Sequence, residues 1–173
     1  RDLVMFKDKS VLAVIPARGG SKGIPRKNVR FLHNKPLIAY SILSAKKSRY
    51  IDRVIVTTDD DEIKEIAYIY GADAVIERPK QLADDTTTLD PVVFHAYNTY
   101  CSSAKEQFDI VVTLQPTSPL LRISSIDGAI EKFVLTNLNT VISVKPVRHL
   151  FWIAKDRSLI PFYPKRLNRQ QLE

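Results

Sequence analysis

Short apolar runs alternate with helical patterns along the 173-residue chain. Near-continuous runs of aliphatic and β-branched residues predict four buried strands, at 11–15, 53–57, 109–114 and 140–144. A shorter strand is predicted at 73–76. Because these runs lack the strict alternation of a strand with one wet face, we expect a mostly parallel sheet that helices cover on both faces.

Apolar residues spaced three and four apart predict four helices between these runs. The helices are expected to begin at Pro36, at 59–61, near Asp90–Pro91 and near Ser124. Gly71 ends the second helix, and in the fourth Ser124 has capping-box spacing to Asp127. The alternation of strands and helices predicts an α/β fold with right-handed crossovers, and ligands are expected beyond the carboxyl ends of the strands.

Composition predicts one globular domain over residues 1–173, because 45% of the residues are hydrophobic and 26% are charged. The single cysteine, Cys101, excludes an internal disulfide and argues against a zinc site built on thiolates. No apolar run approaches the ~18 residues of a membrane span, and the N-terminus has no signal-peptide pattern. We therefore expect a soluble, cytoplasmic protein with no membrane partner. The proline- and arginine-rich tail over 154–173 indicates a dimerisation arm or a second small subregion.

Charge is distributed unevenly along the chain. Residues 1–50 hold 12 Lys and Arg against 2 Asp and Glu, whereas residues 51–100 hold 4 against 11. No carboxylate occurs from Lys9 to Ile51, although ten cationic side chains lie there. Such a segment is expected to face something anionic.

Three of the five glycines lie in the stretch Arg18-Gly-Gly-Ser-Lys-Gly23, directly after the first predicted strand. Glycines let backbone N–H groups approach an anion, and Arg18, Lys22 and Lys27 add charge that matches a polyphosphate. The spacing is neither that of a Walker A loop nor Gly-x-Gly-x-x-Gly. The alternative is a tight turn with solvated lysines.

A second polar stretch, Leu114-Gln-Pro-Thr-Ser-Pro-Leu-Leu-Arg122, also follows a predicted strand. Its two prolines would hold Gln115, Thr117 and Ser118 as fixed hydrogen-bonding groups, or they would stiffen a connector into the next helix.

Two further stretches have structural explanations that we favour over functional ones. Residues 83–88, which follow Arg78-Pro79, are expected to cap a helix through an Asp or Thr side chain. The acidic run 59–62 could bind Mg²⁺, but acidic side chains in the first turn of a helix usually complement its dipole. The three histidines show no metal-ligand spacing and no partner for a catalytic triad.

The stretch Ile15-Pro-Ala-Arg-Gly-Gly-Ser-Lys-Gly-Ile-Pro-Arg-Lys-Asn28 resembles the N-terminal signature of the acylneuraminate cytidylyltransferase family. Later motifs of that family are matched in order and cover nearly the whole chain. They are Thr57-Thr58-Asp59, Arg78-Pro79, Leu82-Ala-Asp-Asp-Thr86, Leu114-Gln-Pro-Thr-Ser-Pro-Leu120 and Arg169-Gln-Gln-Leu172.

The resemblance implies a three-layer α/β/α fold like that of nucleotide-diphospho-sugar transferases, a Rossmann-like arrangement with a mostly parallel sheet. It also implies a reaction in which the anomeric hydroxyl of a sialic-acid-type nonulosonic acid attacks the α-phosphate of CTP. The products are a CMP-sugar and pyrophosphate, and Mg²⁺ is expected to travel largely on the CTP phosphates. The family further implies a homodimer whose arm reaches the neighbouring site.

Two kinds of alternative stay open. A close relative would activate legionaminic, pseudaminic or Kdo acid, or would use another nucleotide. A protein of a different class would bind nucleic acid through residues 9–51, without catalysis. Few aromatic residues interrupt that basic segment, which disfavours base stacking, so no nucleic-acid partner is expected.

The resemblance also assigns roles to particular residues. Arg18 and Lys27 would contact the phosphates, and Gln115 would face the sugar. Arg169 would bind the sugar carboxylate, for which a bidentate guanidinium is suited. The remaining expected nucleotide-binding residues are Ala17, Gly19, Gly20, Ser21, Lys22, Asn28, Arg78, Thr86 and Thr88.

Two departures from the family pattern bear on these expectations. The family's metal-binding Asp-x-Asp pair and its Asn-Gly-Ala-x-Tyr segment follow the Arg-Gln-x-Leu motif, and the sequence ends at Glu173, so no metal ligand is assigned. We expect either a truncated chain or a sequence that does not include the C-terminal part. An extra leucine, Leu121, precedes Arg122 and is expected to shift it.

Overall fold

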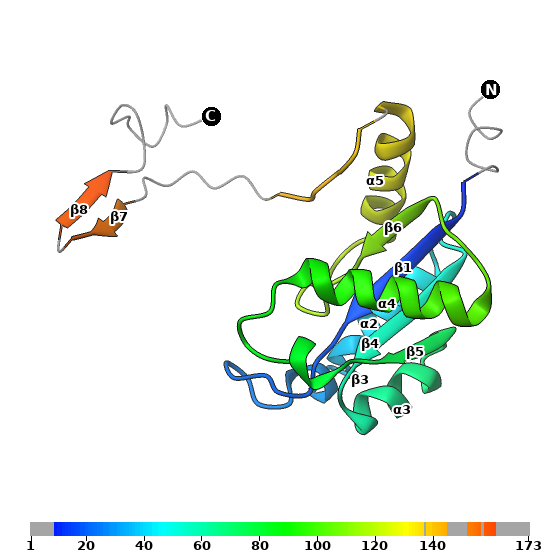
Figure 1. The fold of residues 1–173 in the computed structure, drawn as a ribbon, viewed down its shortest axis with the longest axis horizontal. Helices are drawn as coiled ribbons and strands as arrows, with labels where there is room; N and C mark the ends of the chain where they lie inside the picture. Colours follow the sequence, from blue (N-terminus) through cyan, green and yellow to red (C-terminus); the bar gives the residue numbers. More distant parts are fainter. Residues whose placement is uncertain (1–8, 137, 145–151, 157, 162–173) are drawn as a thin grey trace. The chain divides into compact units, whose positions relative to one another are not determined.

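The computed structural model describes residues 9–136, 138–144, 152–156 and 158–161. Contacts between residues divide the chain into two compact units, Arg1–Val141 and Ile142–Glu173. The elements of the first unit follow one another as shown in Figure 1: β1 (Val11–Pro16), η1 (Lys27–Val29), β2 (Phe31–Leu32), β3 (Lys35–Pro36), α2 (Leu37–Lys46), β4 (Arg53–Thr58), α3 (Asp61–Ile69), β5 (Ala74–Glu77), η2 (Lys80–Leu82), α4 (Leu89–Ala104), β6 (Ile110–Thr113) and α5 (Ile123–Thr136).

Four strands form a parallel sheet in the order β5-β4-β1-β6 (Figure 1). Val14 in the central strand is paired in register with Ile55 of β4 and with Thr113 of β6. Because all four strands run the same way, the loops that follow β1, β4, β5 and β6 emerge at one edge. The predicted parallel sheet is confirmed.

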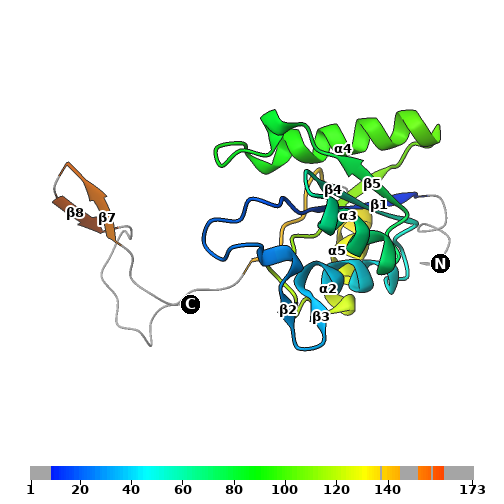
Figure 2. The same cartoon turned by 90° about the horizontal axis from the view of Figure 1, so that it is seen from below.

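Helices cover both faces of this sheet, with α4 on one face and α2, α3 and α5 on the other (Figure 2). Alternate residues of β1 pack in opposite directions: Val11, Ala13 and Ile15 join the core under α2, α3 and α5, and Leu12 and Val14 join the core under α4. Burial of both faces explains the continuous apolar run in the sequence. The three-layer α/β/α fold is confirmed.

The predicted strand at 140–144 is wrong. These residues pair with no strand among the described parts of the chain, and Ile142 and Val144 are 73% and 79% exposed. The β-branched residues fit a pleated surface that neighbouring strands must supply, and without a partner that preference produces no strand.

The predicted capping box of Ser124 and Asp127 is also wrong. The helix begins one residue earlier, at Ile123, so Ser124 lies inside it. The Asp127 carboxylate is buried, and it accepts hydrogen bonds from the Ser48 hydroxyl (2.6 Å) and from the Arg49 side chain (3.2 Å). The Asp127 carboxylate therefore makes tertiary hydrogen bonds to Ser48 and Arg49, and does not cap its own helix as the local spacing predicted.

The second unit contains an antiparallel hairpin of β7 (Trp152–Lys155) and β8 (Ser158–Pro161). The expected arm, 154–173, begins in this hairpin, and residues 162–173 lie outside the described part of the chain. Its role in a dimer stays a prediction, as does the single-domain organisation. Among the described residues, no helix combines the length and the apolar character that crossing a membrane requires.

Candidate functional site

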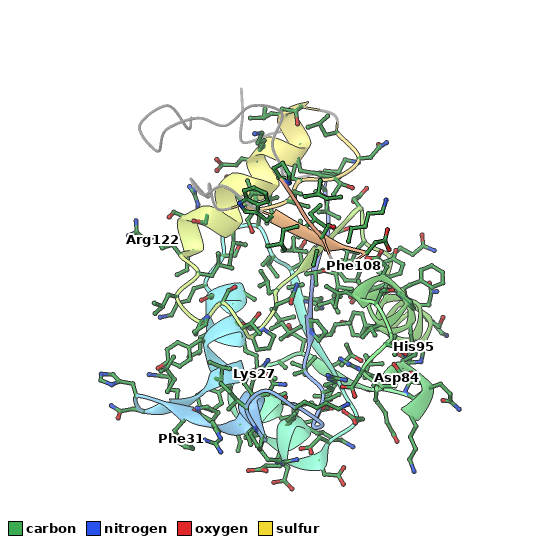
Figure 3. The ribbon with its side chains drawn as sticks, turned by 90° about the vertical axis from the view of Figure 1, so that its left-hand side faces the viewer. Lys27, Phe31, Asp84, His95, Phe108 and Arg122 are labelled. Atoms are coloured by element: carbon green, nitrogen blue, oxygen red, sulfur yellow. The ribbon has the colours of Figure 1, made fainter. Side chains whose placement is uncertain are left out.

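A cavity of about 500 Å³ opens at the carboxyl edge of the sheet, where ligands were expected. The loop after β1, the segment between β5 and α4, and the loop after β6 supply its walls. In Figure 3, Lys27 from the first wall and Asp84 from the second lie at the same end of the molecule. Its lining is Pro16, Arg18, Ser21, Lys22, Gly23, Ile24, Lys27, Asn28, Arg78, Leu82, Asp84, Asp85, Thr87, Thr88, Leu89, Val92, Gln115, Pro116 and Thr117.

Arg78 is a buried cation in the lining of this cavity, with 6% of its surface exposed. One guanidinium nitrogen, Nη2, donates to the backbone oxygen of Thr57 at 2.9 Å, whereas Nε has no hydrogen-bond partner among the described residues. Burial lowers the pKa of the Arg78 guanidinium, and the charge of Asp59 partly offsets this effect. A buried N–H donor without a partner costs free energy, and a ligand in the cavity that supplies an acceptor atom would remove this cost.

The segment 17–28 that follows β1 is called the glycine loop below. Arg18 and Lys22 extend from it and contact the wall formed by the segment between β5 and α4. Arg18 Nη1 donates to the backbone oxygen of Asp84 at 2.6 Å, and Arg18 Nη2 lies 2.8 Å from Asp85 Oδ1. Lys22 forms an ion pair with the other oxygen of Asp85. The hydrogen bond from Lys22 and the one from Arg18 hold the pKa of Asp85 below its ordinary value. One carboxylate thus pairs with two of the three predicted phosphate-binding cations and offsets one of their two positive charges.

The third predicted cation, Lys27, begins the short helix η1 and lines the cavity with its neighbour Asn28. Asn28 is buried, and its side-chain amide donates to the backbone oxygen of Arg18 at 2.9 Å. This bond ties the start of the glycine loop to its end, so that Arg18 and Lys27 are held at the same cavity.

The segment before α4 is shaped by Asp84. Its Oδ1 accepts from the backbone N–H groups of Thr86 (3.0 Å) and Thr87 (2.6 Å), and hydrogen bonds from Thr87 lower the pKa of Asp84. Thr88 precedes the helix, but its side chain makes no capping hydrogen bond. Helix capping, the explanation favoured from spacing, is therefore wrong for this segment, since Asp84 stabilises a turn that forms one wall of the cavity.

The loop after β6 contributes Gln115, Pro116 and Thr117 to the lining. Pro116 is buried, while Gln115 and Thr117 are exposed, and the Ser118 N–H donates to the Gln115 backbone oxygen at 3.1 Å. The proline anchors a turn that presents the two polar side chains on either side of it.

The structure brings together eight of the expected site residues around this cavity: Arg18, Ser21, Lys22, Lys27, Asn28, Arg78, Thr88 and Gln115. Four others are outside its lining. Ala17 is buried in the core, Gly19 bonds to the β4–α3 loop, and Gly20 and Thr86 do not border the cavity. Arg169 lies outside the described residues.

Sequence reasoning missed Asp85 as a site residue, because its stretch was interpreted as a helix cap. The charge pattern could have indicated Asp85. The segment 9–51 is basic and has no carboxylate, so the acidic residues that follow it in the sequence are candidate partners for its cations. The apolar residues Leu82, Leu89 and Val92 were also missed. Each belongs to an ordinary helical pattern, and only the fold shows that they face a cavity.

The described residues contain no group of three or more His, Cys, Asp or Glu side chains that could hold a metal ion. The two carboxylates of the cavity are already engaged, Asp84 with backbone N–H groups and Asp85 with two cations. The described donor set therefore fits an anionic ligand and does not fit a metal cage built from protein side chains.

A parallel α/β sheet with a basic, glycine-containing loop and a buried arginine at its carboxyl edge defines a nucleotide-binding protein. Comparison with known proteins narrows the class. Residues 12–166 match the family model described as cytidylyltransferase. The chain belongs to this family of nucleotidyltransferases.

Two curated relatives illustrate the similarity. The chain is 37% identical over 158 residues to a pseudaminic acid cytidylyltransferase of Campylobacter jejuni, an alignment that covers 89% of this chain and 68% of the relative. It is 39% identical over 137 residues to a CMP-N,N'-diacetyllegionaminic acid synthase of Legionella pneumophila, with 79% of this chain and 58% of the relative covered.

A solved structure supports the fold. The CMP:2-keto-3-deoxy-manno-octonic acid synthetase complexed with CTP superposes with a TM-score of 0.58 at 24% identity, covering 72% of this chain and 47% of that one. The described α/β/α arrangement is thus shared with a cytidylyltransferase.

Proposed function

We propose that this chain transfers the cytidylyl group of CTP to a nonulosonic acid and releases pyrophosphate. One observation carries the proposal: Arg18, Lys22 and Lys27 of the glycine loop line one cavity with the buried, incompletely bonded Arg78. Such a site suits a ligand with a charged polyphosphate end and a polar, hydrogen-bonding end. The curated relatives, named for pseudaminic and legionaminic acid, support an acidic nine-carbon sugar as the acceptor.

The proposed chemistry needs no covalent intermediate. The anomeric hydroxyl oxygen of the sugar attacks the α-phosphorus of CTP, the bond from phosphorus to the bridging oxygen breaks, and pyrophosphate leaves while the hydroxyl proton is lost. Displacement at phosphorus requires positioned reactants and neutralised charge. Arg18, Lys22 and Lys27 supply three positive charges for the triphosphate and for the negative charge that develops on the leaving group.

The other end of the cavity suits the nucleoside. The free Nε–H of Arg78 donates to an acceptor atom of the bound nucleotide, and Leu82, Leu89 and Val92 offer an apolar wall to a flat base. Gln115 and Thr117, on the third wall, face the space left for the sugar. This division of the cavity places the reacting phosphorus between the glycine loop and the loop after β6.

Mg²⁺ enters this proposal as a companion of CTP, bound to its phosphates, because the described residues build no cage for it. A cytoplasmic location, which the sequence pattern led us to expect, and a homodimer, which the family resemblance implies, complete the proposal.

Pyrophosphate release tests the reaction directly. The chain is incubated with CTP and Mg²⁺ while N-acetylneuraminic, legionaminic, pseudaminic and Kdo acids are offered separately, and UTP and GTP replace CTP in parallel. Release with CTP and one of these sugars is expected. Release with UTP or GTP alone would overturn the nucleotide assignment. Calorimetry measures CTP binding in the absence of sugar. A chain that neither binds CTP nor releases pyrophosphate would overturn the proposed function.

A further inference from the structure

The loop that carries the phosphate-facing cations is fastened at both ends to one short acidic stretch. At the start of the loop, the Gly19 N–H donates to Asp59 Oδ1 at 2.9 Å. At its end, the Arg26 guanidinium forms ion pairs with Asp60 and Glu62, including a 3.2 Å hydrogen bond from Nη2 to Asp60 Oδ1. Asp59 and Asp60 lie in the turn from β4 into α3, Glu62 lies in the first turn of α3, and none of the three lines the cavity.

Gly19 shows how closely Asp60 packs against the loop. A Cβ atom added to Gly19 would lie 2.6 Å from Asp60 Oδ2 and 3.0 Å from Asp60 Cβ, whereas one added to Gly20 would meet nothing within 4 Å. The Asp60 side chain has little freedom to move aside, because it also accepts the N–H of Ile63 as the N-cap of α3 (3.0 Å). Contact with Asp60 therefore requires glycine at position 19.

Arg26 connects this contact to the cavity. Its backbone is in the left-handed region (φ 56°), and it immediately precedes η1, which carries Lys27 and Asn28 into the lining. The Asp60 side chain is only 15% exposed, and although burial raises the pKa of Asp60, the hydrogen bonds from Arg26 and from the Ile63 N–H outweigh it and leave that pKa below its ordinary value. The carboxylate is thus charged at neutral pH and stays paired.

We propose that Asp60 is a positioning residue for the nucleotide phosphates. By contacting Gly19 and pairing with Arg26, it fixes both ends of the loop and holds Arg18, Lys22 and Lys27 where the triphosphate binds. Without this attachment the loop must be ordered when the ligand binds, which weakens binding. The inference rests on the proposed function for its ligand, whereas the attachment itself concerns only this chain.

The substitution Asp60→Asn isolates the proposed role. Asparagine is as good an N-cap as aspartate, so α3 keeps its cap while Arg26 loses one of its two charged partners and keeps the other, Glu62. We expect the melting temperature to stay within about 3 °C of wild type and the Kd for CTP to rise about 3- to 10-fold. The expected rise in Kd is this small because Arg26 is partly exposed and solvent screens its ion pair. Asp61→Asn removes the same charge one residue further along, at an exposed position outside the cavity, and is expected to leave CTP binding unchanged.

A second measurement reports on the loop without any nucleotide. Trypsin cleavage after Lys22 is followed by mass spectrometry under conditions in which the core stays folded. Asp60→Asn and Gly19→Ala are both expected to raise the cleavage rate at least about 3-fold, because each removes a loop attachment. Gly20→Ala, which has room for its methyl group, is expected to keep the wild-type cleavage rate.

The outcomes separate the two proposals. Unchanged cleavage and unchanged CTP affinity in Asp60→Asn would overturn the positioning role, and so would equal cleavage rates in Gly19→Ala and Gly20→Ala. If the wild-type chain binds no CTP, the proposed function fails, while the cleavage rates still decide whether Asp60 holds the loop.

Discussion

Asp85 occupies the cations that the proposed function assigns to the triphosphate, and its replacement by asparagine should tighten CTP binding. Arg18 Nη2 lies 2.8 Å from Asp85 Oδ1, and Lys22 pairs with the other oxygen. A carboxylate and a phosphate are alternative anionic partners for the same donors. CTP must therefore displace Asp85 before both cations are available to it.

The size of the effect follows from the exposure of the ion pairs. The Asp85 side chain is 40% exposed and that of Lys22 is 79% exposed, so solvent screens both interactions. Exposed ion pairs of this kind contribute little each, and the loss of two of them corresponds to roughly a 2- to 10-fold change in an equilibrium constant. We expect Asp85→Asn to lower the Kd for CTP by that factor.

Isothermal titration of CTP into wild type and Asp85→Asn, without sugar, measures this change. The gain should shrink when ionic strength rises, because the competing ion pairs are exposed. Glu65→Gln, which removes one negative charge from an exposed position outside the cavity, controls for net charge and should change the Kd less. Weaker CTP binding in Asp85→Asn than in wild type would refute competition and would mean that Asp85 supports the ligand-binding arrangement.

Three further predictions concern catalysis, packing and pH. Arg18→Ala should lower pyrophosphate release by more than about 10-fold while the melting temperature stays near that of wild type, and unfolding instead of inactivation would contradict a phosphate-binding role. Asp127→Ala should lower the free energy of unfolding by about 2 kcal/mol in a denaturant titration, because it removes the buried carboxylate that accepts hydrogen bonds from the half-buried Ser48 hydroxyl and from Arg49. Hydrogen bonds from the Ser10 N–H and then from Lys9 hold the pKa of Asp109 at about 2. The stabilisation from Asp109 should be complete above its unfolded pKa of about 4 and be lost as the pH falls towards 2, and Asp109→Asn should remove this part of the acid profile.

The fold was predictable where burial alone determines the pattern. β1 and β4 are covered on both faces, so their continuous apolar runs identify them without knowledge of their neighbours. β6 is an edge strand, and Val111, in register with Leu12, is 38% exposed, so the expectation that this strand is buried on both faces is wrong. The run at 140–144 has the same composition but is exposed and unpaired among the described residues. Strand formation there depends on a hydrogen-bonding partner, which composition does not reveal.

The site was predictable to the extent that it lies on loops after strands. Arg18 and Lys27 follow β1 and Gln115 follows β6, and parallel pairing brings the ends of these two strands to one cavity. The partners of the cations were not predictable, since Asp60 and Asp85 lie 34 or more residues along the chain from Arg26 and Lys22. Local spacing explains each carboxylate as a cap or a turn, and only the tertiary structure shows what else it contacts.

The carboxylates that pair with the basic segment come from the acidic half of the chain, and they differ in how easily a ligand can replace them. Asp60 is largely buried, is bonded to the N-terminus of α3 as well as to Arg26, and packs against Gly19, so a ligand cannot displace it without disrupting the loop. Asp85 is held mainly by two partly exposed cations on the wall of the cavity, so a triphosphate can replace it at small cost. One carboxylate therefore fixes the position of the loop, and the other is a partner that an anionic ligand can replace.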